Sequence, residues 1–255
     1  MSNSAANSAS NEDDTAATSL YGTTEKVSRI RATIAKRMVE SLRESAQLTA
    51  TVEVDLSAVS TLRAREKDEF RAREGVGLSY LPFIVKASVE ALRRFPKVNA
   101  TLDLEAGLIR YSDAEHIGIA VDTPRGLLVP VVPNAGPQSL TGLAKSIGDI
   151  ASRAKAGKIV AADLAGGTFT VTNYGSVGTL MDTPIINQPQ VAILGMGALV
   201  RRPIVVKDAQ HRETIEIRDM MYVSLSYDHR LVDGADAARF LSFIKQRLEA
   251  GDFTL

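Results

Sequence analysis

The sequence predicts an α/β fold in which strands and helices alternate along the chain. Residues 221–228 alternate apolar and polar side chains, which is the pattern of a strand with one apolar face. After Gly234 the period becomes helical, and four apolar residues form one stripe: Ala237, Leu241, Ile244 and Leu248. Between residues 108 and 195, short apolar runs separated by Pro- and Gly-bearing turns predict further strands.

Composition limits the function classes. The chain has 255 residues, 45% of them hydrophobic, which is enough for one large domain or two small ones with a substantial core. Lys plus Arg equal Asp plus Glu at 30 each, so no overall field favours nucleic acid or an anionic membrane as a partner. Cysteine is absent, which excludes disulfides, thiolate metal sites and a cysteine nucleophile.

No membrane or secretion signal is evident. The apolar run from Val191 to Val200 is ten residues long and contains two glycines, whereas a spanning helix needs about 20 residues. Residues 1–20 lack the basic start and apolar middle of a signal peptide. We therefore expect a cytoplasmic protein.

The first 24 residues differ from the rest. They are rich in Ser, Ala, Asn, Thr and acidic residues, and so poor in apolar groups that we expect a flexible linker. A domain of residues 25–255 follows. The Ala/Ser-rich start resembles the tail of an interdomain linker, so we expect the chain to be the end piece of a longer protein.

The first half of the domain shows three helical patterns and one strand. Residues 28–45 carry an apolar stripe of Ile30, Ile34, Met38 and Leu42, typical of a surface helix. A strand at residues 52–56 precedes a charged helix that we expect Ser57 to cap. The next helix is predicted to begin near Pro82 and to end before Pro96.

Residues 108–132 predict two or three short strands. The run LLVPVV at residues 127–132 is almost wholly apolar, so we expect it to be buried on both faces, with Pro130 marking a bulge or a sheet edge. The segment DTPRG at residues 122–126 is a turn by its Pro and Gly content.

The second half is predicted to contain one further helix and four strands before residue 221. Residues 139–156 have the clearest helical stripe, with Gly157 as the stop. Strands are expected at residues 168–172, 190–195, 204–206 and 214–217, and residues 173–178 form a glycine-bearing loop.

His229 lies where the strand ends and the last helix is about to begin. Such a junction holds a side chain on rigid supports while leaving it open to a cleft, as a general base requires. The alternative is a packing histidine beside an ordinary Asp-Gly helix entry, which is the commoner role of a lone histidine.

Three runs favour the functional interpretation. SYDHRLVDGADAARF at residues 226–240, with IAVDTPRGLLVPVV and FTVTNYGSVG upstream, resembles the catalytic core of the dihydrolipoyl acyltransferases, the core subunits of 2-oxo acid dehydrogenase complexes, and most of all the actinobacterial pyruvate dehydrogenase type. The resemblance extends from about Val27 to the C-terminus. It implies the chloramphenicol-acetyltransferase-like fold, a two-layer α+β sandwich of a mixed sheet with helices on one side, assembled as homotrimers with active sites between subunits.

The resemblance also implies roles for individual residues. His229 would be the base, and the Thr172 hydroxyl, given by the neighbouring subunit, would stabilise an oxyanion. Asp233 would hold the loop, paired with Arg29, and Gly234 would support it. Five residues would line the substrate channel: Asp122, Thr123, Gly126, Leu127 and Asn173. Without the resemblance, Thr172 reads as an ordinary β-branched strand residue and residues 122–126 as a simple turn.

The reaction implied is transfer of an acyl group between dihydrolipoyl-lysine and coenzyme A. An ordinary thiol has a pKa of about 8.5 and imidazole one of about 6.5, so a neutral imidazole can take the thiol proton as sulfur attacks, without an acyl-enzyme. Acetyl transfer is favoured and succinyl transfer stays open. A small-molecule O-acetyltransferase and an inactive structural core are the remaining alternatives.

Partners follow from the same resemblance. No lipoyl domain or peripheral-subunit-binding domain is recognisable before the core, so we expect the lipoyl group to be carried by a domain outside this chain. The expected partners are that lipoyl domain, the dehydrogenase components and further copies of the chain, as a homotrimer or a larger assembly. No metal site is expected, because His116, His211 and His229 show no recognised ligand spacing.

Overall fold

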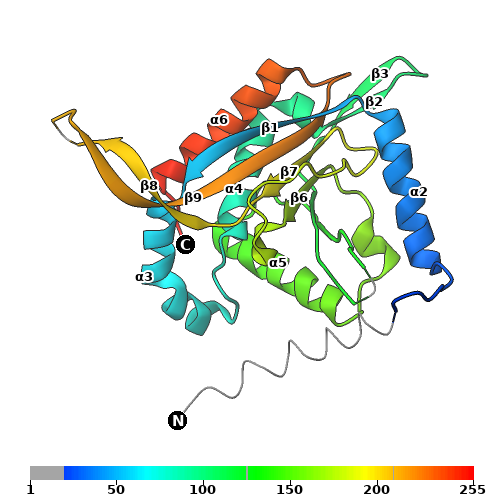
Figure 1. Cartoon of the computed structure of the whole chain (residues 1–255), viewed down its shortest axis with the longest axis horizontal. Helices are drawn as coiled ribbons and strands as arrows, with labels where there is room; N and C mark the ends of the chain where they lie inside the picture. The colour runs from blue at the N-terminus through cyan, green and yellow to red at the C-terminus, as the bar shows by residue number, and fades with distance from the viewer. Residues whose placement is uncertain (1–19, 125, 209) are drawn as a thin grey trace, which may run out of the picture.

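A computed structural model of the chain describes residues 20–124, 126–208 and 210–255. It contains a mixed seven-stranded sheet, a separate two-stranded hairpin, and helices that lie mainly along one face of the sheet (Figure 1). The predicted mixed sheet is thus confirmed. Of the predicted linker, residues 1–19 lie outside the described residues, as does Arg125 of the predicted turn; residues 20–24 are exposed.

The helices agree with the predicted ones to within a few residues. The α-helices are α2 (Arg29–Glu44), α3 (Ser57–Glu74), α4 (Leu81–Arg94), α5 (Leu140–Lys155) and α6 (Gly234–Ala250). Three short 3₁₀ helices accompany them: η1 (Pro96–Asn99), η2 (Ala161–Leu164) and η3 (Gly175–Val177). No helix within the described ranges is long and apolar enough to cross a bilayer.

The strands are β1 (Gln47–Asp55), β2 (Ala100–Asp103), β3 (Leu108–Tyr111), β4 (Ile117–Ile119), β5 (Val131–Val132), β6 (Phe169–Asn173), β7 (Ala192–Met196), β8 (Val200–Lys207) and β9 (Glu213–Asp228). The main sheet has the order β1-β9-β7-β6-β4-β5. Strands β4, β6 and β7 are parallel, and β9 is antiparallel to β7 and β1. The first half of β9 pairs with β8 in a ribbon that projects beyond the sheet (Figure 1).

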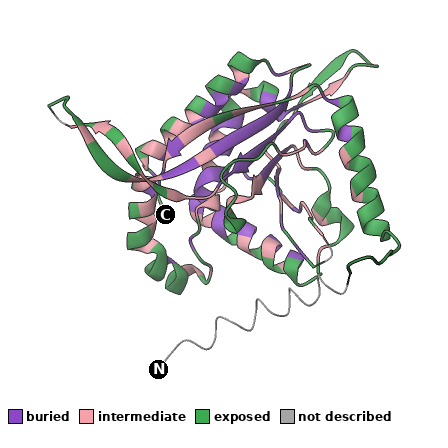
Figure 2. Ribbon diagram, viewed as in Figure 1, coloured by how far each residue is buried: buried purple, intermediate pink, exposed green. Residues whose placement is uncertain are grey.

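The core lies between the sheet and helices α4, α5 and α6. The predicted apolar face of β9 and the predicted stripe of α6 are both buried, as Figure 2 shows in purple. Burial of these side chains supplies the main driving force for the fold, at about 25 cal/mol per Å² of apolar surface removed from water. The periodicities at the C-terminal end therefore predicted the central packing correctly.

The second face of β9 is polar and also buried. Ser224 and Ser226 are fully buried, and their hydroxyls bond to Thr51 at 2.9 Å and to Thr49 at 2.8 Å on β1. Buried hydroxyls need such partners because an unsatisfied one costs about 1–3 kcal/mol. Ser224 and Ser226 are thus part of the interior and do not face solvent.

Helix α2 lies beside the sheet and is attached to it by polar contacts. Ser28 caps its start by accepting from Arg31 N at 3.2 Å. Ser41 Oγ donates to the carbonyl of Ile186 at 2.6 Å, and Gln47 bonds the same segment at Ile186 N at 3.1 Å. The predicted apolar stripe is only partly covered within the chain, because Ile30 and Leu42 at its ends are exposed. An uncovered stripe of this kind is a surface available for contact with another molecule.

The structure overturns two local predictions. Ser57 is the first residue of α3 and not its cap, because its hydroxyl accepts from Asp219 N at 3.0 Å while Asp55 Oδ1 accepts from Ser57 N at 2.9 Å. Residues 127–132 are not buried on both faces: only Val131–Val132 form a strand, β5, at the sheet edge, and Leu127 is exposed. The edge predicted at Pro130 is confirmed.

Candidate active site

His229 follows the last residue of β9 and stands on a doubly attached backbone. The amide of Asp228 donates to the carbonyl of Val191 at 2.8 Å, and the amide of His229 donates to the carbonyl of Ala46 at 2.9 Å. The imidazole is nevertheless 41% exposed. The predicted position of His229 at a strand–helix junction is confirmed, while its opening into a cleft stays a prediction.

Asp233 and Gly234 form the entry to α6. Asp233 is the N-cap residue, and its carbonyl accepts from Ala237 N at 3.0 Å. Its carboxylate is 70% exposed, with Oδ1 4.0 Å from His229 Nδ1, which is beyond hydrogen-bond distance. A Cβ added to Gly234 would lie 3.6 Å from Tyr227 Oη, an ordinary contact. Asp233 therefore shapes this turn through its backbone, and its side chain makes no hydrogen bond to the described residues.

Arg29 lies far from Asp233 in the same chain. It begins α2, a helix of 16 residues, whereas Ala46, which holds the backbone of His229, lies just past the other end. Such a helix is about 24 Å long at about 1.5 Å per residue. Within the described ranges no ion pair joins Arg29 to Asp233, so the predicted pairing is not made inside one copy of the chain.

The predicted channel residues gather around Thr172 at the other end of the sheet. Ala120 N donates to the carbonyl of Val171 at 3.0 Å, so the turn at residues 122–127 leaves β4 beside the end of β6. Thr123 Oγ1 closes this turn on the carbonyl of Gly126 at 2.7 Å. On β6, Asn173 Oδ1 accepts from Ser176 N at 3.1 Å and starts the next loop.

The sheet register separates this group from His229. Thr172 pairs with Gly195 on β7, and Gly195 pairs with Ser224 on β9. His229 is five residues farther along β9, which is roughly 16 Å along the strands and about 10 Å across two strand spacings. The two predicted catalytic side chains of one chain therefore lie at opposite ends of its sheet and cannot act on the same carbonyl.

One feature beside Thr172 escaped the sequence analysis. The ring of Tyr174 lies against Gly195, where an added Cβ would be 2.5 Å from its Cε1 atom. Burial raises the pKa of the Tyr174 hydroxyl. A glycine in a strand often marks a close approach by another group, so Gly195 was the available signal.

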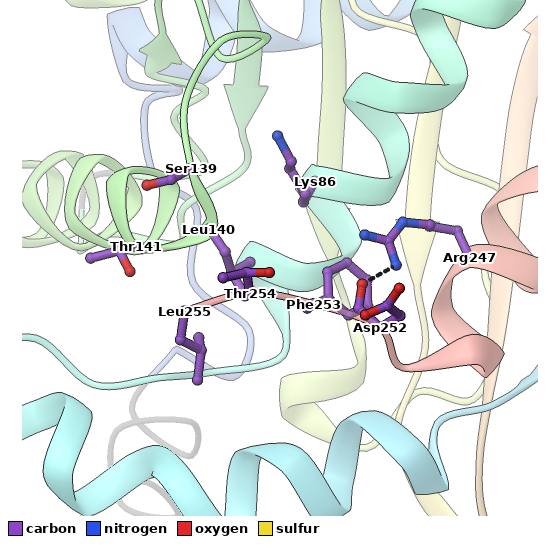
Figure 3. A pocket seen from close by; sticks show the side chains of 9 residues that line it. All are labelled: Lys86, Ser139, Leu140, Thr141, Arg247, Asp252, Phe253, Thr254 and Leu255. Atoms are coloured by element: carbon purple, nitrogen blue, oxygen red, sulfur yellow. Dashed lines mark hydrogen bonds between the residues drawn. The ribbon is translucent and has the colours of Figure 1, made fainter.

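Two grooves lie on the described surface. One, of about 480 Å³, is bordered by the β2–β3 hairpin, Glu44, Gln188, Pro189 and Arg230, the residue after His229. The other, of about 520 Å³, surrounds the C-terminal segment, where Arg247 stacks on Phe253 and donates to the carbonyl of Asp252 at 2.6 Å (Figure 3). The second groove contains none of the predicted site residues.

Comparison with known proteins identifies the family of the chain. Residues 21–255 match the family described as 2-oxoacid dehydrogenases acyltransferase (catalytic domain). The chain is 54% identical, over 92% of its length and 42% of the relative's, to the dihydrolipoyllysine-residue acetyltransferase component of pyruvate dehydrogenase complex of Mycobacterium tuberculosis. It is 46% identical, over 88% of its length and 52% of the relative's, to the dihydrolipoyllysine-residue succinyltransferase component of 2-oxoglutarate dehydrogenase complex of Bacillus subtilis.

Solved structures agree. The probable dihydrolipoamide acetyltransferase of Listeria monocytogenes superposes with a TM-score of 0.84 at 38% identity, covering 90% of this chain and 95% of that one. A chloramphenicol acetyltransferase, at 14% identity and a TM-score of 0.51, covers 88% of this chain and 95% of that one and shows the shared fold alone. The chain spans about two fifths of the length of the mycobacterial relative. These matches confirm the resemblance and the fold inferred from the sequence: the chain belongs to the 2-oxoacid dehydrogenase acyltransferase family and corresponds to its catalytic domain.

Proposed function

We propose that the chain transfers an acyl group, acetyl in preference to succinyl, between a dihydrolipoyl thioester and coenzyme A. One observation carries the proposal: in a chain of this family, His229 presents an exposed imidazole from a backbone fixed to two neighbouring segments. The 54% identity to an acetyltransferase favours acetyl. The 46% identity to a succinyltransferase keeps succinyl as the second candidate.

The chemistry needs one base and one hydrogen-bond donor. Neutral His229 accepts the proton of the attacking thiol while sulfur bonds to the thioester carbonyl carbon. The carbonyl oxygen then carries negative charge, which the Thr172 hydroxyl stabilises by donating a hydrogen bond. Collapse of the tetrahedral intermediate breaks the original carbon–sulfur bond, and the departing sulfur takes the proton from His229. The enzyme is never acylated.

Two copies of the chain are needed to build this site. His229 and Thr172 of one copy are too far apart, so the base of one copy has to meet the hydroxyl of another. Helix α2 supports the same arrangement, because Ile34 reaches the turn beside Thr172, where its Cδ1 would lie 3.7 Å from a Cβ at Gly126. We propose that Arg29, five residues before Ile34 at the start of α2, pairs with Asp233 of the neighbouring copy.

Both ends of the sheet carry exposed apolar side chains that suit such a contact. Near His229 these are Leu42, Leu48, Leu104, Leu108 and Tyr111; near Thr172 they are Leu127, Val177, Leu180 and Met181. The two surfaces are different, and a contact between unlike surfaces closes into a ring when the rotation allows it. A homotrimer is the ring that we propose.

The wider setting belongs to the same proposal. The relatives are named as components of pyruvate and 2-oxoglutarate dehydrogenase complexes, and one structural neighbour is named as the cubic core of the first of these. We propose that the rings of this chain form such a core in the cytoplasm and receive acyl groups from a lipoyl domain that the dehydrogenase component charges.

The test is a comparison of acyl donors and acceptors. The purified chain is assayed with acetyl-CoA or succinyl-CoA and free dihydrolipoamide, and in parallel with a hydroxyl acceptor such as chloramphenicol. We expect S-acyl dihydrolipoamide to form, faster from acetyl-CoA. Faster transfer from succinyl-CoA would replace acetyl by succinyl, and transfer to the hydroxyl acceptor alone would contradict the proposal.

A further inference from the structure

The two residues on either side of His229 are joined to each other. The Asp228 side chain is 3% exposed, and both of its oxygens accept hydrogen bonds from the Arg230 guanidinium. Oδ2 accepts from Nη2 at 2.8 Å and from Nε at 3.0 Å, and Oδ1 accepts from Nε at 3.1 Å. Oδ1 also accepts from the backbone amide of Arg230 at 3.1 Å. This forked, charge-assisted arrangement fixes both partners in orientation as well as in distance.

The same carboxylate attaches the histidine loop to the neighbouring segment. Asp228 Oδ1 accepts from Ala46 N at 3.2 Å, while the carbonyl of Ala46 accepts from His229 N at 2.9 Å. Ala46 lies between α2 and β1, so the contact joins three elements. The imidazole itself makes no hydrogen bond in the part of the chain that the structure describes; its ring lies 5.8 Å from the ring of Tyr227, centroid to centroid, so its position depends mainly on this backbone.

We propose that Asp228 and Arg230 are positioning residues for His229. The inference rests on the function proposed above. The fork holds the residues before and after the histidine at a fixed separation, and the bond to Ala46 fixes the pair against β1. A base has to lie within about 3 Å of the proton that it removes, and a displacement of about 1 Å costs on the order of 10²-fold in rate.

The pair depends on both charges. A carboxylate as buried as Asp228 is tolerated in the interior only when it is paired and hydrogen-bonded. Arg230 supplies that partner, and its hydrogen bond to Asp228 raises the pKa of the guanidinium. Lysine at 230 would keep the charge but lose the planar fork, so the backbone would be held less firmly.

The chain offers a matched control far from the histidine. Asp163 also accepts from a backbone amide, Val160 N at 2.9 Å, and from an arginine, Arg153 Nη1 at 2.9 and 3.0 Å. Its replacement removes the same kinds of bond at the end of α5, where none of the proposed site residues lies. Asp163→Asn therefore reports the cost of losing such a pair without touching His229.

The experiment measures acetyl transfer by the whole chain with acetyl-CoA and dihydrolipoamide. Asp228→Asn is expected to lower kcat by about 10- to 100-fold, with KM for acetyl-CoA and for dihydrolipoamide within about twofold of the wild type. The kcat of Arg230→Lys is expected to fall between that of Asp228→Asn and that of the wild type, and Asp163→Asn is expected to keep kcat within about twofold. A kcat loss in Asp228→Asn no larger than that in Asp163→Asn would overturn the inference. If Asp228→Asn does not fold, full kcat in Arg230→Lys would overturn it.

A measurement that does not depend on acyl transfer tests this inference separately from the proposed function. The chain has three histidines, so the imidazole NMR signals of His229 can be assigned with His229→Ala. In Arg230→Lys and Asp228→Asn these signals are expected to shift or broaden, while those of His116 and His211 stay unchanged. Unchanged His229 signals would contradict the positioning role, whether or not the wild type transfers an acyl group. A wild type that transfers no acyl group would by itself contradict only the proposed function.

Discussion

The two ends of the sheet are built in different ways. At one end His229 has a backbone held by Val191 and Ala46 and a side chain that makes no hydrogen bond within the described residues. At the other end Thr172 sits inside strand β6, half-buried, beside a loop that packs on Gly195. The first end presents an imidazole from a rigid support, and the second presents a hydroxyl from a regular strand.

The difference agrees with the parts that we propose for the two ends in the reaction. A base has to reach a proton on an incoming thiol, so it needs exposure; a hydrogen-bond donor for an oxyanion needs a fixed direction, which a strand supplies. Within one copy neither end has both side chains, because the sheet keeps His229 and Thr172 roughly 16 Å apart along the strands. The following changes test the two ends in turn.

The largest effect on activity is expected at the end of the sheet that carries His229. His229→Ala should lower kcat by about 10² to 10⁴, because the thiol proton has no other acceptor in place. The melting temperature should stay near that of the wild type, because the imidazole is 41% exposed and makes no hydrogen bond to the described residues. Stopped-flow or steady-state acyl transfer to dihydrolipoamide measures the first quantity and thermal denaturation the second. Near-normal turnover would remove His229 from the mechanism.

Thr172→Ala should lower kcat by about 10² to 10³, through loss of one donor to the oxyanion. Thr172→Ser keeps the hydroxyl and is the matched control, so it should keep most of the activity. Steady-state kinetics on both variants make the comparison. An alanine variant as active as the serine variant would return Thr172 to the role of an ordinary strand residue.

Gly195→Ala tests the packing that supports Thr172. The new methyl group would lie 2.5 Å from the Tyr174 ring, so the ring has to move, at a cost of about 1–3 kcal/mol in the free energy of unfolding. Gly148→Ala is the control, because Gly148 lies inside α5, where alanine favours the helix over glycine. Its new methyl group would lie 3.6 Å from Val76, an ordinary contact. Urea denaturation of both measures the difference, and equal stabilities would show that Tyr174 is not fixed on Gly195.

The smallest effect is expected where α2 attaches. Ser41→Ala removes the 2.6 Å hydrogen bond to the carbonyl of Ile186 and should cost about 1 kcal/mol in the free energy of unfolding. Ser28→Gly, at the cap of the same helix, should cost a few tenths of a kcal/mol at most. Denaturation midpoints compare them. A Ser41 variant as stable as the wild type would mean that the helix is held by its apolar contacts.

Periodicity was enough to predict the elements that form the core. The stripe of α6 and the apolar alternation of β9 depend on spacing within one segment, and both were placed correctly, with His229 between them. Where a residue's surroundings come from distant segments, spacing failed. Residues 127–132 have an apolar sequence but only one neighbouring strand, and the hydroxyl of Ser57 found Asp219, 162 residues away.

The site shows the same limit. The sequence motifs identified His229 and Thr172, but the distance between them depends on the register of β6, β7 and β9, which no local pattern contains. Asp228 and Arg230 were visible as opposite charges flanking the histidine, yet the burial of Asp228 and its contact with Ala46 follow only from the packing of α2 and β1 against the end of β9.

Co-expression of the His229→Ala and Thr172→Ala chains tests the shared site most directly. If each site takes its base from one copy and its hydroxyl from the next, random mixing in a ring rebuilds about one site in four, although each variant alone is nearly inactive. We predict about a quarter of wild-type kcat per site from the mixed protein. Activity no higher than that of the two variants measured separately would show that no site is shared between copies.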